Sequence, residues 1–542
     1  MKKKGILLFG RLTNPAFVVL AVCLLLLTVS LYFTYQSWSY NSDDVSWQTI
    51  LLTWNVFNGH VAYMGARDNF LANVPLFVLF GRFLPMNRTA LFVESASFAG
   101  LNFMLFYMAG LYFLKRCRVR ISYFSLMPFL WLSSFGFGFS QLYMNTDWRD
   151  FEAGVSFIFF MLAAMVCFDD VELLKTWSSR LMAGVTCVIA SIFIYSDPYF
   201  LYFTIVPIVI LFFAMFMMKK VSRRTLLIVT ASALFSTALA RIIGYGTVRA
   251  GLLIPAGTGI VLSSLHDVIP NLGHALAGLL TVFGVAYDGR SALSGTITSI
   301  TSAVCNVVLV GFILYCLYRS KPSRSTIESS APNVLALTST FLTLLIIIIV
   351  SAYTFSNVTV VGNYRYLFLA VFAGTLLLAL RSATLQKTRN VFMFVLTLAT
   401  ALNVVVSYSG ASSVNAQAPI SRPNAQNTAL VDTIKRLGLT KGYTNYWDGN
   451  INTYLSAGKV EFLPVGCSKG KTDPLDLLVD SSLFKQLATK SFFVDDSINN
   501  GADPACSGPQ VVAQFGQPSQ EIRVSNYTIF VYSYDIAAKM PE

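Results

Sequence analysis

Apolar runs long enough for a helix to cross a bilayer recur along the first 410 residues of this chain. Crossing a hydrocarbon core about 30 Å thick takes roughly 20 helical residues. Hydrophobic residues make up 55% of the sequence and charged residues 12%, whereas soluble domains carry roughly 25% charged residues. Lipid is therefore the expected solvent, and the sequence predicts a polytopic α-helical membrane protein.

The apolar runs predict about eleven spanning helices. The first run, from Pro15 to Phe33, follows three lysines, as a signal peptide would, but it is too long and lacks a small-residue cleavage site. We therefore interpret it as a retained helix. The predicted spans lie near 13–35, 89–114, 121–141, 154–168, 180–196, 199–218, 225–243, 296–318, 334–356, 366–380 and 390–409.

The basic residues predict which loops face the cytoplasm, because an excess of Lys and Arg in short loops marks that side. Residues 1–410 contain 28 basic and 14 acidic residues. With the N-terminus inside, 20 of the 28 basic residues fall on the cytoplasmic side, whereas ten of the 14 acidic residues and all three histidines fall on or near the outer side. The net charge of +13 thus reflects topology and not a nucleic-acid partner, and chemistry is expected on the outer face.

Composition divides the chain into a membrane domain over 1–410, a linker over 411–426 and a tail domain over 427–542. The linker is rich in Ser, Asn, Gln, Ala and Pro. An odd number of crossings places the tail outside the cytoplasm. Its pattern predicts a small α/β domain, with a helix carrying Leu430, Ile434 and Leu437 and strands near 459–465, 491–494 and 527–532.

Two outer loops are long, at about 36–88 and about 244–295. Within them, Phe70–Leu84 and Val268–Ala286 are predicted to lie along the interface or to be re-entrant. Counting the second segment as a span would reverse the orientation of everything after it, against the basic loops that follow.

Six of the eight cysteines lie in or beside apolar runs and are interpreted as helix packing residues. Cys467 and Cys506 are in the polar tail, where an oxidising compartment would allow a disulfide. Two cysteines alone define no framework, so this pairing stays open at the level of sequence.

An acidic pair, Asp43 and Asp44, directly follows the first predicted helix. Each of two adjacent carboxylates raises the pKa of the other, which suits a group that accepts a proton near neutral pH. A solvated pair of loop residues is the alternative, and the pattern alone favours it. His60 lies in the same outer loop and joins the candidate substrate-binding residues.

The segment after the third predicted helix contains Arg149, Asp150 and Glu152, next to Trp148. So many charges suit a polar ligand, although Trp at headgroup depth also fits an interfacial anchor. The density of charge favours the ligand.

Arg365 lies between Tyr364 and Tyr366 at the outer start of the tenth predicted helix, where its guanidinium is placed to contact a lipid phosphate. Arg241 and Arg249 near the seventh helix carry the same hypothesis. Snorkelling to ordinary headgroups is the alternative for all three.

Asp197 lies in the Asp-Pro turn between the fifth and sixth helices, where proline explains the turn without function. Glu94 and Asn102 are predicted to point into the bundle. The sequence contains no P-loop, no zinc-ligand spacing and no Gly-rich dinucleotide loop, so no metal site is assigned.

Together these features resemble the GT-C glycosyltransferases, membrane enzymes that use polyprenyl-phosphate-linked sugars. The shared features are the uncleaved first helix with its acidic pair, a long first outer loop, the Arg/acid motif, the Asp-Pro turn, the late Arg-Tyr pair and an outward tail. Leu437–Trp447 (LGLTKGYTNYW) resembles the soluble domain of bacterial members.

The resemblance implies that Asp43 is the catalytic base, with Asp44 as its neighbour or replacement, because many members carry Asp-Glu or Asp-Tyr where this chain has Asp-Asp. Glu152, preceded by Arg149, matches the second acidic site, and Arg365 the contact to the donor phosphate. The implied partners are a polyprenyl-phosphate sugar and a glycan or lipid-linked acceptor, in a bacterial inner membrane.

The implied reaction requires no cofactor, since a lipid phosphate already leaves readily; a divalent metal is not indicated. The main alternative is a transporter or flippase for a lipid-linked sugar. Transporters usually place polar groups near the midplane and contain inverted repeats, whereas this chain concentrates acidic residues at one face. We therefore expect an enzyme.

Overall fold

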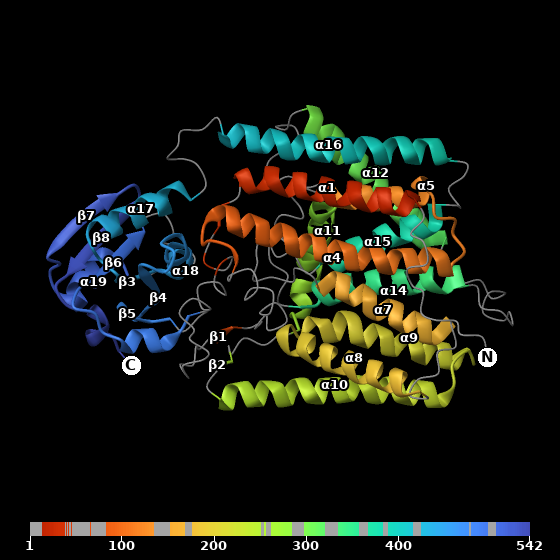
Figure 1. The fold of residues 1–542 in the computed structure, drawn as a ribbon, viewed down its shortest axis with the longest axis horizontal. Coiled ribbons are helices and arrows are strands. Elements are labelled where there is room, and N and C mark those ends of the chain that lie inside the picture. The colour runs from red at the N-terminus through yellow and green to blue at the C-terminus, as the bar shows by residue number, and fades with distance from the viewer. Residues whose placement is uncertain are drawn as a thin grey trace.

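The computed structural model describes a helical bundle followed by a mixed α/β tail domain (Figure 1). The described residues are 14–37, 39–40, 42, 45, 65–66, 83–134, 152–168, 176–250, 254–255, 262–284, 297–319, 334–356, 367–382, 388–415, 424–475, 479–496 and 506–541.

Seven helices of the described part are long and apolar enough to cross a membrane. These are α1 (Asn14–Ser37), α4 (Arg88–Arg116), α8 (Trp177–Ser196), α10 (Arg223–Arg249), α12 (Ile297–Arg319), α14 (Val334–Thr354) and α16 (Arg389–Asn415). They fit a multi-pass membrane protein, as the hydropathy predicts.

The four other predicted spans are also helical, but shorter. They are α5 (Tyr123–Ser133), α7 (Glu152–Phe168), α9 (Val206–Met217) with the π-helical turn Leu201–Ile205 before it, and α15 (Phe368–Arg381). A helix thus occupies each predicted position, while the total of eleven crossings stays a prediction.

Two helices continue beyond their predicted ends. Helix α10 reaches Arg249, through Gly244 and Gly246, where the sequence suggests a Gly-rich loop. A Cβ atom at Gly244 would lie 3.0 Å from the Tyr195 ring, so this glycine permits close packing of α8 on α10. Helix α16 likewise continues to Asn415, into the predicted linker.

Basic residues gather at one end of the bundle, called here the basic end. Lys115 and Arg116 close α4, Arg319 closes α12 and Arg381 closes α15, and Arg381 lies within electrostatic range of Arg319 and of Cys117. The tail domain lies against the opposite end (Figure 1), called the tail end. The basic residues that close these helices therefore gather at the end of the bundle that the predicted topology places in the cytoplasm.

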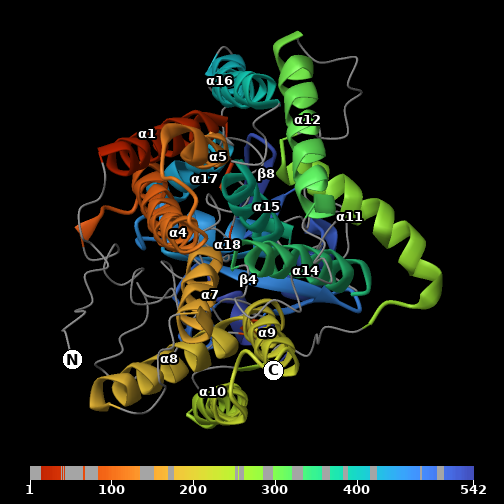
Figure 2. The ribbon, with the colours of Figure 1, turned by 90° about the vertical axis from the view of Figure 1, so that its right-hand side faces the viewer.

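The middle of the bundle is built from α7 and α15 packed on α4. Rings of Phe106 (α4), Phe157 (α7) and Phe372 (α15) meet with centroids 4.7 to 6.4 Å apart. Residues 368–380 of α15 are all buried. Helices α4, α7 and α15 consequently pack together in the middle of the bundle, whereas α9 lies near its edge beside α10 (Figure 2).

A buried polar network joins α5, α12 and α16. The Trp131 indole N–H donates to Asn306 Oδ1 (3.0 Å), Asn306 Nδ2 donates to Asn403 Oδ1 (3.0 Å) and Asn403 Nδ2 donates to Ser134 Oγ (3.3 Å). Ser302 Oγ also donates to Asn403 Oδ1 (2.8 Å). In lipid such bonds fix which helices pack together.

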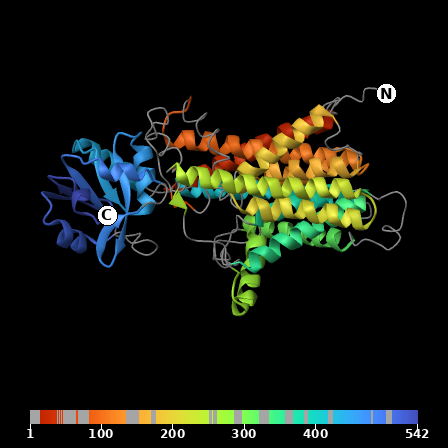
Figure 3. The ribbon, with the colours of Figure 1, turned by 90° about the horizontal axis from the view of Figure 1, so that it is seen from below.

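Helix α11 (Val268–Val282) occupies the segment predicted to be interfacial or re-entrant, and it projects sideways from the bundle (Figure 3). Asn271 Nδ2 fixes its start by donating to Ser263 Oγ and to the carbonyl of Thr354, both at 3.0 Å. Ile269 and Leu276 are exposed along α11, which suits a helix lying against lipid.

The tail confirms the small α/β domain and contains a six-stranded sheet in the order β5-β4-β3-β6-β8-β7. Strand β3 pairs parallel with β4 and β6, and the outer pairs are antiparallel. Cys467 and Cys506 form a disulfide, which answers the open pairing. The elements are α17 (Ala425–Arg436), β3 (Lys441–Thr444), α18 (Tyr446–Leu455), β4 (Glu461–Ser468), β5 (Lys471–Pro474), β6 (Ser491–Asp496), α19 (Gly508–Phe515), β7 (Gln520–Val524) and β8 (Tyr527–Tyr532).

Candidate functional site

Four of the predicted site residues lie within the described residues, namely Glu152, Asp197, Arg241 and Arg249. The others lie outside them, so their roles stay predictions: Asp43, Asp44, His60, Arg149, Asp150, Tyr364 and Arg365. Described residues precede or follow several of them in the chain, and these show where the segments that contain the predicted residues begin and end.

The residues just before the acidic pair are hydrogen-bonded to the tail domain. Asn424 Nδ2 donates to the Tyr40 carbonyl (2.7 Å) and its Oδ1 accepts from the Tyr40 N–H (3.0 Å). The Ser42 N–H donates to the Trp447 carbonyl (3.2 Å), and Ser42 Oγ accepts from the Asn450 N–H (3.0 Å). The first outer loop therefore starts directly beside α18.

The start of α4 completes this contact. Tyr454 of α18 donates its hydroxyl to the carbonyl of Asn87 (3.4 Å), and Arg88 donates to the carbonyl of Tyr35 in α1 (2.6 Å). Burial, and secondarily the nearby Glu94 carboxylate, raises the pKa of Tyr454. Glu94 is itself buried, as predicted. The tail end is thus a junction of α1, α4 and α18.

Glu152 lies much deeper in the bundle than this junction. It is the half-buried first residue of α7, and the N–H of Gly154, one half-turn on, donates to Asn102 Oδ1 of α4 (2.5 Å). Asn102 follows Arg88 by 14 residues, or about 21 Å of helix. Glu152 is therefore offset from the α18 contact by about 20 Å along the bundle.

The start of α15 lies at the same depth as Glu152. Phe157 follows Glu152 by five residues and Phe372 follows Leu367 by five residues, and the two rings are 6.4 Å apart. Because both helices run toward the basic end, their first residues lie at the same depth in the bundle. Arg365 precedes Leu367 by two residues in sequence and lies outside the described residues.

The buried Asp197 is the C-cap of α8. Its Oδ1 accepts the N–H of Tyr199 (2.9 Å) and its own N–H donates to the Phe193 carbonyl (2.8 Å). These bonds build the turn, so the turn-forming interpretation accounts for this aspartate.

Arg241 and Arg249 are both exposed on α10. Arg241 follows Arg223 at the basic end by 18 residues, about 27 Å of helix, which approaches the roughly 30 Å of a hydrocarbon core. Arg249 lies about 12 Å farther out. A bilayer is about 40–45 Å thick with its headgroup regions, so helical rise puts Arg249, about 39 Å from Arg223, closer to the opposite lipid phosphates than Arg241.

The two long outer loops meet each other, which no sequence signal indicates. Gly65–Ala66 pairs parallel with Ile254–Pro255. The second loop also bonds the end of α14, where the Ser263 N–H donates to the Phe355 carbonyl (2.9 Å). Segment 357–366, which carries Tyr364 and Arg365, follows directly in sequence.

A buried carboxyl cluster behind the first-loop contact is centred on Asp448, to which the sequence analysis gives no role. Asp448 Oδ1 accepts from Tyr527 (3.0 Å) and from Asn427 (3.1 Å), and its Oδ2 accepts from Asn445 (2.9 Å). Burial, together with the Asp496 carboxylate, raises the pKa of Asp448 to about 7.

Among the described residues no group of three or more His, Cys, Asp or Glu side chains could hold a metal ion. The described part of the site offers instead carboxylates, amides and guanidinium groups, which suit proton transfer and phosphate contact. Compared with known proteins, the chain matches no family model and no curated protein.

Proposed function

We propose that this protein is an inverting glycosyltransferase that moves a sugar from a polyprenyl-phosphate carrier to a hydroxyl of a cell-envelope glycan or lipid-linked acceptor. The proposal rests on the resemblance to GT-C enzymes and on a membrane bundle with an α/β tail. The observation that carries it furthest is the bonding of Tyr40 and Ser42, beside the acidic pair, to the tail at the end opposite the basic loops.

In this proposal the tail end faces the periplasm or the cell exterior, because the basic end matches the cytoplasmic loops. Asp43, or Asp44 in its place, removes the proton from the acceptor hydroxyl. The hydroxyl oxygen forms a bond to the anomeric carbon while the bond from that carbon to the phosphate oxygen breaks, and polyprenyl phosphate leaves as the anion. Attack opposite the phosphate inverts the anomeric centre.

Arginine side chains would stabilise the departing phosphate. Arg365 is the first candidate, and the depth of Arg249 favours it over Arg241 as a second contact. Arg149, Asp150, His60 and Tyr364 are proposed to bind the sugar or the acceptor.

The depth of Glu152 supports a role on the donor side. Its level with the start of α15 supports an ion pair with Arg365, and its offset of about 20 Å from the α18 junction argues against a proton shared with Asp43. Glu152 is then a positioning residue for the phosphate-binding arginine.

The test uses purified protein in nanodiscs with radiolabelled polyprenyl-phosphate sugars and envelope glycan as acceptor. Asp43→Asn and Asp44→Asn are compared with Asp432→Asn, an exposed tail aspartate. One first-loop variant is expected to lose transfer while keeping donor binding, and Arg365→Ala to lose donor binding. Wild-type turnover by both aspartate variants would remove the pair from catalysis.

The flippase alternative has one observation in its favour, the neutral polar network of Asn306 and Asn403 inside the bundle, since transporters place polar groups in the bilayer interior. Movement of a fluorescent lipid-linked sugar between the leaflets of proteoliposomes, without any transfer product, would select this alternative.

A further inference from the structure

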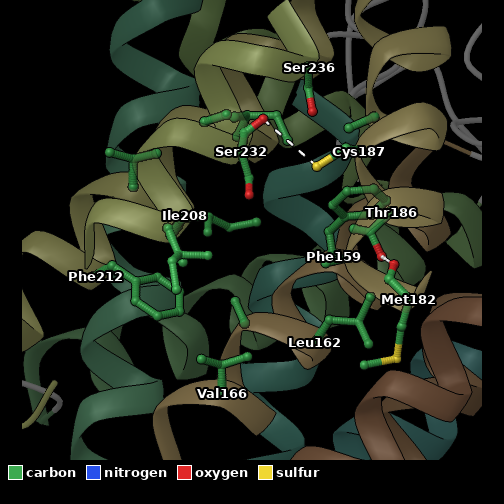
Figure 4. A pocket seen from close by; sticks show the side chains of 18 of the residues that line it. Phe159, Leu162, Val166, Met182, Thr186, Cys187, Ile208, Phe212, Ser232 and Ser236 are labelled. Atoms are coloured by element: carbon green, nitrogen blue, oxygen red, sulfur yellow. Dashed lines mark hydrogen bonds between the residues drawn. The ribbon is translucent and has the colours of Figure 1, made fainter. Parts of the chain in front are cut away.

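A large apolar pocket lies between α7, α8, α9 and α10, away from the proposed catalytic site (Figure 4). Its empty space is about 950 Å³, partly open to the outside. Phe159, Leu162, Met182, Ile208 and Phe212 point into it (Figure 4). Such a pocket in a membrane bundle is suited to hydrocarbon.

Five polar side chains line the pocket, and three of them interact with their own surroundings. Thr186 donates its hydroxyl to the Met182 carbonyl (2.8 Å), and Ser179 belongs to the capping box of α8. Cys187 Sγ points at the Ser232 carbonyl at 4.0 Å. The Ser232 and Ser236 side chains also line the pocket (Figure 4), but the rest of its wall is apolar, which suits an apolar chain.

The length and place of the pocket match one leaflet of a bilayer. Along α8 it extends from Ser179 to Ala190, which is about 16 Å of helix, or close to half of a hydrocarbon core about 30 Å thick. Ser179 lies in the first turn of α8 at the basic end. The pocket therefore begins at the bilayer surface of that end and stops near the midplane.

Basic residues surround the surface end of the pocket. Arg180 follows Ser179, Arg223 and Arg224 begin α10 about one turn before the pocket residue Ile228, and Lys219 and Lys220 follow α9. The acidic residues in the described part of α7 to α10 are Glu152 and Asp197, both at the other end. Asp169, Asp170 and Glu172 belong to segment 169–175, outside the described residues.

We infer that this pocket binds an acyl chain of an anionic phospholipid, whose phosphate lies against the basic residues at the starts of α8 and α10. Basic pockets between helices on the positively charged side of a membrane protein select anionic headgroups. This site lies at the opposite end of the bundle from the proposed donor phosphate, so it does not depend on the proposed function.

Photolabelling tests the inference on the full-length protein in nanodiscs. Phosphatidylglycerol or phosphatidylcholine carrying a diazirine on one acyl chain is added in trace amount, and labelled peptides are mapped by mass spectrometry. The phosphatidylglycerol probe is expected to label α8 and α10 peptides that contain pocket residues at least about fivefold more than phosphatidylcholine, the effect of about one cation near the surface. Equal labelling by the two probes would overturn the inference.

Two pairs of variants separate the pocket from general lipid contact. Ala233→Phe fills the pocket and is expected to remove the selective label, whereas Ala231→Phe, on the exposed face of the same helix, keeps it. Unchanged labelling of a folded Ala233→Phe protein would contradict the site.

The second pair of variants changes surface charge and leaves the packing of the pocket as it is. Arg223→Gln with Arg224→Gln is expected to lower phosphatidylglycerol labelling to the level of phosphatidylcholine, because both arginines are exposed. The control, Arg118→Gln with Arg120→Gln, removes two exposed charges elsewhere on the basic end. An equal loss in both double variants would show general charge attraction and overturn a specific site.

Discussion

Raising the pH from about 5 to about 8.5 is expected to loosen the tail domain around Asp448, because the folded tail holds this carboxyl in its protonated form. Its pKa rises from the ordinary 3.8 to about 7, first through burial and then through the charge of Asp496. Since the folded state binds the proton more tightly than the unfolded state, stability is present below about pH 4 and is lost as the pH rises through 7.

The size of the effect follows from the shift. Each pKa unit corresponds to about 1.4 kcal/mol, so a shift of roughly three units makes the tail less stable by about 4 kcal/mol above pH 7 than below pH 4. Asp496→Asn removes the second cause, so it should lower the pKa of Asp448 and flatten the dependence. Asp432→Asn, on the exposed face of α17, should leave it unchanged.

Hydrogen exchange of peptides from α18 and β8 in the full-length protein measures this, after correction for the intrinsic pH dependence of exchange. Protection in the wild type should fall as the pH rises, and protection in Asp496→Asn should change less. A wild-type protein whose protection does not change between pH 5 and 8.5 would refute the reasoning, as would an Asp432→Asn protein that behaves like Asp496→Asn.

Three other perturbations test the packing. Gly154→Ala places a Cβ atom 2.4 Å from the Asn102 carbonyl oxygen, so it should destabilise the bundle by about 1–3 kcal/mol in thermal unfolding, whereas Gly184→Ala, with open space around it, should not. Asn403→Leu leaves its buried partners unpaired and should cost about 1–3 kcal/mol, seen as a lower melting temperature in detergent. Cys467→Ser opens the disulfide of the tail and should cost about 2–4 kcal/mol, and a reductant should lower the melting temperature of the wild type but not of this variant.

Hydropathy predicted the helices well because lipid selects the same residues wherever a segment crosses it. Helix α12 spans Ile297–Arg319 against a predicted 296–318. In the tail, the strands with continuous β-branched and aromatic residues were found, such as β8. The short β3 was missed, since KGYT carries a glycine whose missing Cβ makes room for the Phe492 ring, a requirement that only the folded partner reveals.

The candidate site could be predicted only in part. The sequence indicates which charged residues face which side, but depth depends on packing, and the bond between Gly154 and Asn102 sets the level of Glu152. The contact of the first loop with the tail uses main-chain groups and the amide of Asn424, which leave no periodic pattern. Hydrophobic periodicity carries no information about such bonds.

The bonds that fix the first outer loop join residues 384 and 408 positions apart, Tyr40 to Asn424 and Ser42 to Asn450. A ribosome makes the loop early and the tail last, at roughly 5–20 residues per second. During translation Tyr40 and Ser42 therefore have no tail partner until most of the chain has been made. A nascent protein that stops before Asn424 would carry every described helix of the bundle and lack both anchors, so synthesis of the tail is the step that fixes Tyr40 and Ser42.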